Sequence, residues 1–261
     1  MVMFKTDNYK NKTVVITGGT KGIGLGITKA YLSLSAKVII LARNKPKKLI
    51  QVKGNKALFY QCNVRDNANV EEVINEVFKA NKCIDVLINN AGGAPLINSL
   101  DASMNFNNAI IDLNLNSSFT VSYYVAKKMI KKSSGCVITN ISSVTATRPT
   151  PGSAAYGAAK GGLVNLTKTL AVEWAPRIRV NSIITGYIET ENSLVHYGSK
   201  KDMKAVAKSI PMKRMGTPED IANACIFLSS ANSSWITGTA IEVHGGGESP
   251  TYLNSAKPKK S

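Results

Sequence analysis

Residues that bind metals or form disulfides are scarce in this sequence. It has two histidines, His196 and His244, and four widely spaced cysteines that form no Cys-x-x-Cys pair. So few candidate ligands exclude a typical zinc site, and we expect no bound metal. Because the cysteines lie among apolar residues, we expect reduced thiols in the core of a cytoplasmic protein rather than a disulfide framework.

Long apolar runs are absent as well. No stretch approaches the roughly 18 uninterrupted apolar residues that a membrane-spanning helix needs, so we expect no membrane segment. Residues 1–12 lack the apolar segment of a secretory signal peptide. The composition, 44% hydrophobic and 19% charged residues, can bury a large core and excludes a disordered chain.

Acidic residues are also few. The chain has 16 Asp and Glu against 33 Lys and Arg, which gives a formal net charge of +17. We favour a solvated basic surface as the interpretation. The second interpretation is attraction to a phosphate-bearing substrate, such as a coenzyme A thioester, or to an acidic carrier protein. No aromatic residues interleave with the lysine clusters and no DNA-binding motif accompanies them, so we expect no nucleic-acid partner.

What the sequence does contain is a regular alternation of two kinds of segment. Apolar runs rich in β-branched residues lie at 13–17, 37–42, 57–62, 86–90, 136–141, 179–184 and 240–243. Amphipathic stretches lie between them, near 22–34, 67–81, 104–132, 154–175 and 218–229. Apolar strands that alternate with helices are typical of a parallel sheet buried on both faces. The pattern predicts an α/β fold: a single Rossmann-type domain over 1–247 with a doubly wound, mostly parallel, seven-stranded sheet.

Two segments fall outside this alternation. Residues 187–212 form a long excursion of mixed composition between a strand and the last helix. Such an excursion at the carboxyl end of a strand is where α/β enzymes hold their ligands, so we expect a substrate lid there. Residues 248–261 are polar and predict a C-terminal tail outside the folded domain.

A glycine-rich turn follows the first apolar run. Gly18, Gly22 and Gly24 stand between that strand and the first helix, in the sequence Thr17-Gly-Gly-Thr-Lys-Gly-Ile-Gly24. Glycines allow a tight turn and a close approach of the backbone to a pyrophosphate, whose charge the helix N-terminus stabilises. The position at the first strand–helix junction therefore predicts a dinucleotide-binding site.

The end of the second apolar run indicates which dinucleotide binds. An acidic residue there would bond the ribose 2′-hydroxyl of NAD, but the run ends with Ala42-Arg43. Arg43 can bind a 2′-phosphate with two parallel hydrogen bonds, and Lys21 in the glycine-rich turn adds a second cation. The sequence predicts NADP(H) as the cofactor.

Three further residues are arranged for proton transfer. Tyr156 and Lys160 are four residues apart and therefore share one face of a helix. A nearby ammonium favours a phenolate, so we expect Lys160 to lower the pKa of Tyr156 from its usual value near ~10. Tyr156 would then act as a general acid that protonates a carbonyl oxygen, while Ser143 hydrogen-bonds the same oxygen. The sequence predicts hydride transfer to a carbonyl group.

In this order, the motifs resemble those of the short-chain dehydrogenase/reductase family, and specifically its NADP-preferring subgroup. The resemblance covers about residues 10–247. It rests on the turn at 17–24, Asn89-Asn90-Ala91-Gly92, Asn114, Ser143, Tyr156, Lys160, Arg179-Val180-Asn181-Ser182, Ile236-Thr237-Gly238 and Gly245-Gly246.

The resemblance implies a role for each matching residue. Tyr156 would be the general acid/base, Ser143 would polarise the carbonyl, Lys160 would hold the nicotinamide ribose, and Asn114 would anchor a water in a proton relay. The implied cofactor contacts are Gly18, Thr20, Lys21, Gly22, Ile23, Gly24, Arg43, Asn63, Val64, Asn90, Ala91, Gly92, Tyr156, Lys160, Gly186, Ile188 and Thr190. The family also implies a homotetramer, or a dimer, formed through the helices at 104–132 and 154–175.

Three positions depart from the family pattern. An Asp-Val pair that usually contacts adenine is Asn63-Val64, and the usual Pro-Gly is Thr185-Gly186, which predicts a looser turn beside the nicotinamide. An Asp that is common before the final glycines is replaced by His244. None of these changes removes a catalytic group.

The substrate stays open at this point. The sequence resembles both 3-oxoacyl thioester reductases and general ketone reductases, and it resembles enoyl-thioester reductases, which reduce a C=C bond, more faintly. A catalytically silent, nucleotide-binding regulatory protein is the remaining alternative. A hydrolase is excluded because the His244-Gly-Gly-Gly247 stretch has no accompanying G-x-S-x-G motif.

Overall fold

A seven-stranded parallel sheet forms the centre of the molecule in the computed structural model, which describes residues 9–131 and 135–248. The strand order is β5-β2-β1-β6-β7-β8-β9, and the predicted doubly wound sheet is confirmed. The strands are β1 (Thr13–Thr17), β2 (Lys37–Ala42), β5 (Leu58–Gln61), β6 (Val86–Asn89), β7 (Cys136–Ser143), β8 (Ile178–Thr185) and β9 (Ala240–Val243). The predicted tail at 248–261 lies, apart from its first residue, outside the described residues.

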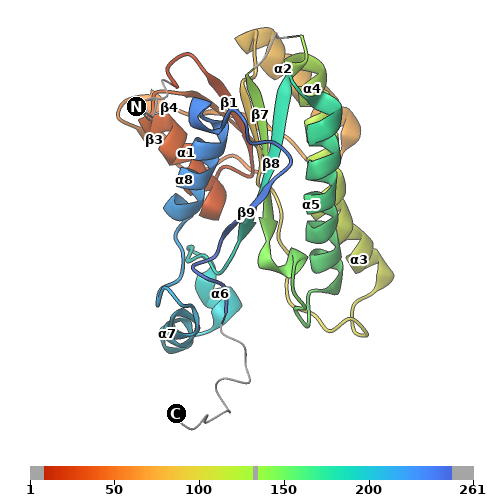
Figure 1. Cartoon of the computed structure of the whole chain (residues 1–261), viewed down its shortest axis with the longest axis vertical. Helices are drawn as coiled ribbons and strands as arrows, with labels where there is room; N and C mark the ends of the chain where they lie inside the picture. Colours follow the sequence, from red (N-terminus) through yellow and green to blue (C-terminus); the bar gives the residue numbers. More distant parts are fainter. Residues whose placement is uncertain (1–8, 132–134, 249–261) are drawn as a thin grey trace.

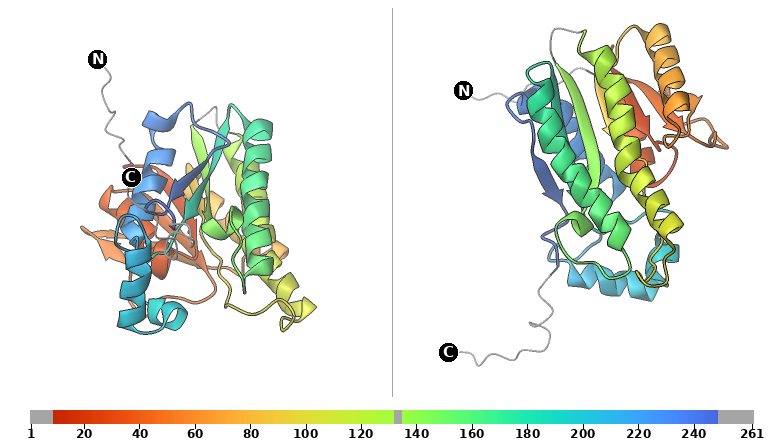
Figure 2. Two further views of the ribbon diagram at one scale, coloured as in Figure 1. Left: turned by 60° about the horizontal axis from the view of Figure 1, so that its bottom comes forward. Right: turned by 90° about the vertical axis from the view of Figure 1, so that its right-hand side faces the viewer.

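Helices cover both faces of this sheet (Figure 1 and Figure 2). One face carries α1 (Gly22–Ser33) and α8 (Pro218–Ser229), and the other carries α2 (Asn67–Asn81), α4 (Ser117–Met129) and α5 (Ala154–Trp174). Each layer has its own apolar core. In β1, for example, Val14 and Ile16 pack toward α1 and α8, whereas Val15 packs toward α2 and α4. Burial on both faces explains why the central strands are apolar throughout.

The helix predicted over 104–132 is present as a continuous helical run from Met104 to Met129, but a π-helical turn interrupts its α-helical geometry. It consists of α3 (Met104–Ile111), a π-helical turn at Asp112–Asn116 and α4. The π turn contains Asn114, whose buried side chain hydrogen-bonds the backbone of Gly93 and Ile110. Contacts with a neighbouring loop thus accompany the break in regular helical geometry, as is frequent at functional sites.

The connections hold two small elements that the sequence pattern does not predict. A hairpin of β3 (Gln51–Val52) and β4 (Asn55–Lys56) lies between β2 and β5 and turns through Lys53-Gly54, both with positive φ. The excursion at 187–212 contains α6 (Ser193–Tyr197) and α7 (Lys200–Ser209). Figure 1 shows both of these helices beyond the carboxyl ends of the strands.

None of the helices in the described residues has the length and apolar character that crossing a bilayer requires. None of the four cysteines, all of which lie in the described residues, forms a disulfide, and Cys62, Cys136 and Cys225 are buried.

Candidate functional site

A cleft of about 490 Å³ opens at the carboxyl ends of the central strands. It spans the junction of β1 and β6, where the strand order reverses direction, which is the usual ligand position in open α/β sheets. The predicted site residues that line it are Gly18, Thr20, Lys21, Gly22, Ile23, Gly24, Arg43, Val64, Asn90, Ala91, Gly92, Tyr156, Lys160 and Thr190. Residues from distant parts of the sequence therefore converge on one cavity, as expected.

Five predicted site residues are not among those that line this cleft: Asn63, Asn114, Ser143, Gly186 and Ile188. The cleft also has walls that sequence reasoning missed, formed by Leu41, Ala42, Asn44, Cys62, Gly93, Leu113, Ile141, Ser142, Thr185, Asn192 and His196. Most of these residues are direct neighbours in the sequence of a strand end or a motif that the sequence pattern identified. Asn192 and His196 belong to the excursion at 187–212, and no sequence signal sets its conformation.

The glycine-rich turn is held tightly against β6. Gly18 has a positive φ of 67°. A Cβ at Gly24 would lie 2.3 Å from the Gly18 carbonyl oxygen, so only glycine fits that position. The Asn90 side chain donates to the carbonyl oxygens of Thr17 and Gly18 at 3.0 and 3.2 Å. The turn thus has a fixed shape before any ligand binds.

The first amide of α1 holds an anion. The Gly22 N–H donates to Oε1 of Glu191 at 2.8 Å, although the two residues are 169 positions apart in the sequence. Free N–H groups at a helix N-terminus attract negative charge, and the Glu191 carboxylate uses this property. The turn is therefore able to bind an anionic group such as a pyrophosphate.

The charged side chains in the walls of the cleft are all basic. Lys21, Arg43 and Lys160 line it, and no acidic residue is among the described residues that do. Lys21 and Arg43 also have no ion-pair partner within the described part of the chain. An elongated anionic ligand is thus the kind of molecule that fits this cleft.

Lys160 fastens α5 to β7 at the inner end of the cleft. Its Nζ donates to the Ile141 carbonyl oxygen at 2.8 Å, and its own carbonyl oxygen accepts from the Ser142 hydroxyl at 3.1 Å. Only 4% of the residue is exposed. Burial lowers the pKa of Lys160 from 10.5 to about 8, because a charged ammonium loses its hydration there.

Tyr156 lies beside this lysine, with Nζ of Lys160 5.6 Å from the centre of the phenol ring. The expected lowering of the Tyr156 pKa is not observed: burial raises it, and a hydrogen bond with Ser143 offsets part of that increase. The reason is that Lys160 directs its ammonium to a backbone carbonyl rather than to the phenol. Ser143, at the end of β7, is brought to the tyrosine as predicted.

The side chain of Asn114 is hydrogen-bonded to the backbone of the loop that follows β6. Its Oδ1 accepts from the Gly93 N–H at 2.8 Å, and its Nδ2 donates to the carbonyl oxygens of Gly93 and Ile110 at 3.1 and 2.9 Å. A Cβ at Gly92 would lie 2.6 Å from Asn114 Oδ1 and 3.2 Å from Lys160 Nζ. Asn114 therefore fixes the loop after β6 next to Lys160, and its role in a proton relay stays a prediction.

The positions that depart from the family pattern are well fixed. Asn63 accepts a bond from the Arg65 N–H at 3.3 Å and so stabilises the turn before α2. A Cβ at Gly186 would lie 2.6 Å from that of His244, so two of the departures pack against each other. Thr185 donates to the Ser142 carbonyl oxygen at 2.9 Å. The Thr185-Gly186 turn is consequently not loose, contrary to the prediction.

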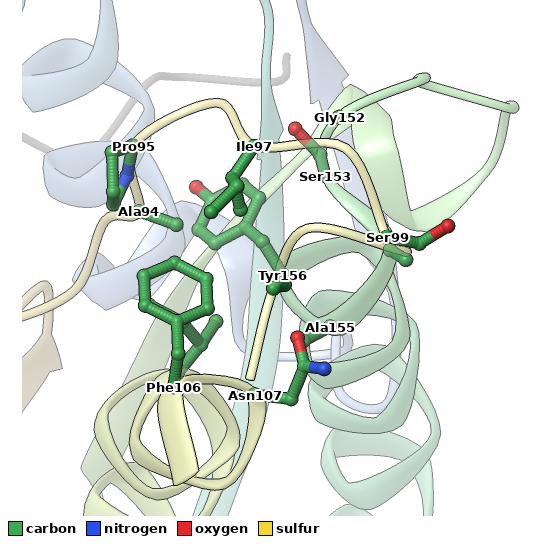
Figure 3. A pocket seen from close by; sticks show the side chains of 13 residues that line it. Ala94, Pro95, Ile97, Ser99, Phe106, Asn107, Gly152, Ser153, Ala155 and Tyr156 are labelled. Atoms are coloured by element: carbon green, nitrogen blue, oxygen red, sulfur yellow. The ribbon is translucent and has the colours of Figure 1, made fainter. Parts of the chain in front are cut away.

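On its other side, Tyr156 borders a small hollow that Figure 3 shows from close by. Ala94, Pro95, Ile97 and Phe106 contribute to its largely apolar wall. At about 10 Å³, the hollow has room for one water at most and cannot accept an acyl chain in this conformation.

Metal ligands are not gathered anywhere in the described residues: no group of three or more His, Cys, Asp or Glu side chains could hold an ion.

Comparison with known proteins agrees with this geometry. A family described as Enoyl-(Acyl carrier protein) reductase matches residues 18–248. A 3-oxoacyl-(acyl-carrier-protein) reductase of Chlamydia muridarum is 36% identical over 244 residues, which is 90% of this chain and 97% of that protein. A probable 2,4-dienoyl-CoA reductase of Bacillus subtilis is 35% identical over 245 residues, with 91% and 96% covered.

Among solved structures, the aldohexose dehydrogenase of Thermoplasma acidophilum in its ligand-free form superimposes with a TM-score of 0.85 at 31% identity. The match covers 97% of this chain and 98% of the other. The fold, the ordered motifs and these relatives together assign the chain to the short-chain dehydrogenase/reductase family, as an oxidoreductase that acts on C=O and CH–OH groups.

Proposed function

We propose that the protein is an NADP(H)-dependent reductase that interconverts a carbonyl group and a secondary alcohol, with a 3-oxoacyl thioester or a small ketone as substrate. The observation that carries this proposal is a basic cleft lined by Tyr156 and Lys160, with Ser143 hydrogen-bonded to Tyr156 beside it. The printed name of the Chlamydia relative supports the thioester as the substrate class.

The residues of the cleft fit a dinucleotide. The amide of Gly22 already holds a carboxylate at the N-terminus of α1, where a pyrophosphate would bind. Arg43 and Lys21 lie at the end of β2 and in the glycine-rich turn, where they would bind a 2′-phosphate. Thr190 and the ammonium of Lys160 would hold the nicotinamide half. A bound nicotinamide would supply the hydride.

The protein's own groups would handle the proton. Tyr156 would donate its phenolic proton to the carbonyl oxygen as the carbon is reduced, and Ser143 would stabilise the same oxygen by a hydrogen bond. Because burial raises the pKa of Tyr156, the phenol stays protonated at neutral pH and is ready to act as an acid. In this structure the Lys160 ammonium bonds the Ile141 carbonyl oxygen, so it would stabilise the phenolate left behind only after turning toward the phenol.

Reduction of a C=C bond is the second candidate. It is favoured by the description of the matching family and by the printed name of the Bacillus relative. The paired Tyr156 and Lys160 beside Ser143 serve carbonyl protonation, so we rank it below carbonyl reduction. A silent regulatory protein ranks lower still, because all three groups are present.

The proposal also covers the oligomeric state of the protein and its cellular compartment. Exposed apolar side chains on α4 and α5, among them Phe119, Tyr123 and Val172, support a homotetramer or dimer formed through these helices. Cysteines that form no disulfide in the described residues support a cytoplasmic location.

Removing the proton donor tests the mechanism. We expect Tyr156→Phe to lower kcat with an acetoacetyl thioester by roughly 10²–10⁴-fold, because general acid catalysis contributes about that much. NADPH binding, followed by fluorescence titration, should persist because little volume is removed. Turnover near the wild-type rate would contradict the role of Tyr156.

Reversing the charge at Arg43 tests the cofactor. Loss of hydrogen bonds to a charged group costs about 1.5–3 kcal/mol, so Arg43→Asp should weaken NADPH binding by roughly 10–100-fold. NADH binding should be spared or improved. Equal losses for the two dinucleotides, measured side by side, would exclude a 2′-phosphate contact.

Removing the charge of Glu191 tests the anion position at α1. The carboxylate competes with a pyrophosphate for the Gly22 amide, so we expect Glu191→Gln to tighten NADPH binding about 2–5-fold, the effect of roughly 0.3–1 kcal/mol. Glu189→Gln is the matched control, since Glu189 is exposed in the same loop. If both variants bind NADPH like the wild type, Glu191 does not occupy the pyrophosphate position.

Burial of Lys160 should cost stability at neutral pH. Its pKa is lowered from 10.5 to about 8 in the folded state. Below pH 8 the lysine is charged in both states and the penalty is complete. Between pH 8 and 10.5 the unfolded chain binds more protons, so stability rises with pH.

We therefore expect Lys160→Met to be more stable than the wild type at pH 7 by about 2 kcal/mol. This is the difference between a penalty of about 3 kcal/mol and a lost hydrogen bond of about 1 kcal/mol. The difference should shrink as the pH approaches 10.5, and activity should be lost. Urea unfolding of the variant and the wild type at pH 7 and at pH 10 measures the stability difference at each pH. A variant that is less stable than the wild type at pH 7 would contradict the prediction.

A further inference from the structure

Arg148, Tyr187 and Glu248 form a charged cluster. Arg148 stands between Ser143 and Tyr156, in the loop from β7 to α5. Its Nη2 donates to the hydroxyl of Tyr187 at 2.9 Å and to Oε1 of Glu248 at 2.7 Å. The Tyr187 hydroxyl also hydrogen-bonds Glu248. The Glu248 carboxylate is thus held by two side chains that come from different loops.

An aromatic contact extends this cluster. The ring of Tyr187 packs edge-on against that of Tyr197, with 5.9 Å between the ring centres. Tyr197 in turn is near enough to Tyr156 for the two phenols to affect each other's titration, as burial and both neighbouring tyrosines raise its pKa to about 12. Tyr197 thus packs on the Arg148 cluster, and Arg148 itself stands on the connection between Ser143 and Tyr156.

We propose that Arg148 and Tyr187 form a specificity-determining subsite that binds an anionic group of the substrate, and that Glu248 occupies this subsite while no substrate is bound. The inference rests on the proposed carbonyl reduction and adds to it a substrate class: carbonyl compounds that carry a carboxylate or a phosphate beyond the reacting centre.

The donors suit such a group. A guanidinium and a phenol can donate together to the oxygens of one carboxylate or phosphate, and hydrogen bonds to charged groups are stronger than neutral ones. The side chain of Arg148 is 32% exposed, so a ligand can reach it from solvent. The carboxylate of Glu248 shows that an anion fits between the two donors.

Glu248 is also easy to displace. It follows Gly245, Gly246 and Gly247, which have no side chains and all have positive φ. Its side chain is 30% exposed, and an ion pair of this kind contributes only about 0.2–1 kcal/mol. A substrate anion that is held elsewhere by its carbonyl end would replace it.

The test compares charged and neutral substrates that share one carbonyl group. We would measure kcat/KM for a 3-oxo ester against its ω-carboxylate analogue, and for acetoacetyl N-acetylcysteamine against acetoacetyl coenzyme A. The first pair reports on a carboxylate and the second on phosphates. The quantity of interest is the charged-to-neutral ratio within each pair.

Arg148→Met and Glu248→Gln break the same ion pair, but the subsite predicts opposite results. Arg148→Met should lower the ratio by roughly 10–100-fold in at least one pair, because it removes the donor to the substrate anion. Glu248→Gln should raise the same ratio by roughly 2–5-fold, because it removes the competing carboxylate. Tyr187→Phe should lower it by a smaller factor.

Arg177→Met is the matched control, since Arg177 is an exposed arginine that binds the Ile130 carbonyl, away from this cluster. It should leave both ratios unchanged. If Arg148→Met and Glu248→Gln shift the ratios in the same direction or not at all, the ion pair only holds the segment after β9 in place. The proposal is then overturned.

Calorimetric binding of the ω-carboxylate compound separates this proposal from the proposed function. The subsite predicts the affinity order Glu248→Gln, wild type, Arg148→Met, with or without turnover. If no carbonyl compound is reduced but this order holds, the reaction is assigned wrongly and the subsite stands. Equal affinities would overturn the subsite even if the neutral ester is reduced.

Discussion

The attachment of helix α5 to strand β7 depends on one residue, Lys160. Its ammonium bonds the backbone of β7 at Ile141, and its own carbonyl oxygen is bonded by Ser142 from the same strand. Helix α5 is thus fixed to β7 through both the side chain and the backbone of one position. Because Tyr156 lies one turn earlier on α5 and Ser143 ends β7, this attachment sets the distance between the two groups that would face the substrate. The burial that makes it possible also destabilises the charged form of the lysine.

The excess of positive charge has a local counterpart in the site. Three basic residues line the cleft, and a fourth, Arg148, stands on the connection between Ser143 and Tyr156. Two carboxylates are bound at such positions, Glu191 at the glycine-rich turn and Glu248 at Arg148. Both come from segments that follow the last two strands. The protein's own acids thus lie where anionic parts of a cofactor and a substrate would bind.

The sheet and the cleft could be predicted because both follow from periodic and local patterns. Fully apolar runs identify buried parallel strands, and the carboxyl ends of such strands must meet at one edge, which brings Gly18 and Asn90 together. The π turn at Asn114 could not be predicted, since it depends on a hydrogen bond to Gly93 in another loop. His196 was missed for a similar reason, because its loop conformation is set by tertiary contacts.

The chemistry of single groups was harder to predict than their positions. The spacing of Tyr156 and Lys160 correctly places them side by side, but it does not reveal that the ammonium points to a backbone carbonyl. Nor does the sequence reveal burial, which determines the direction of both pKa shifts. Glu191 and Glu248 gave no signal at all, because their partners are far away in the chain.

The strand order has a consequence for the nascent chain. Strands β5, β2 and β1 come first in the chain and form one side of the sheet, whereas the other edge of β1 pairs with β6, beginning with Val14 opposite Val86. Until that strand is synthesised, the apolar edge at Val14–Ile16 has no partner in the native sheet and is exposed to other chains. The strands β6, β7, β8 and β9 then follow one another outward in the order of synthesis, so pairing at this edge is the step that joins the two sides of the sheet.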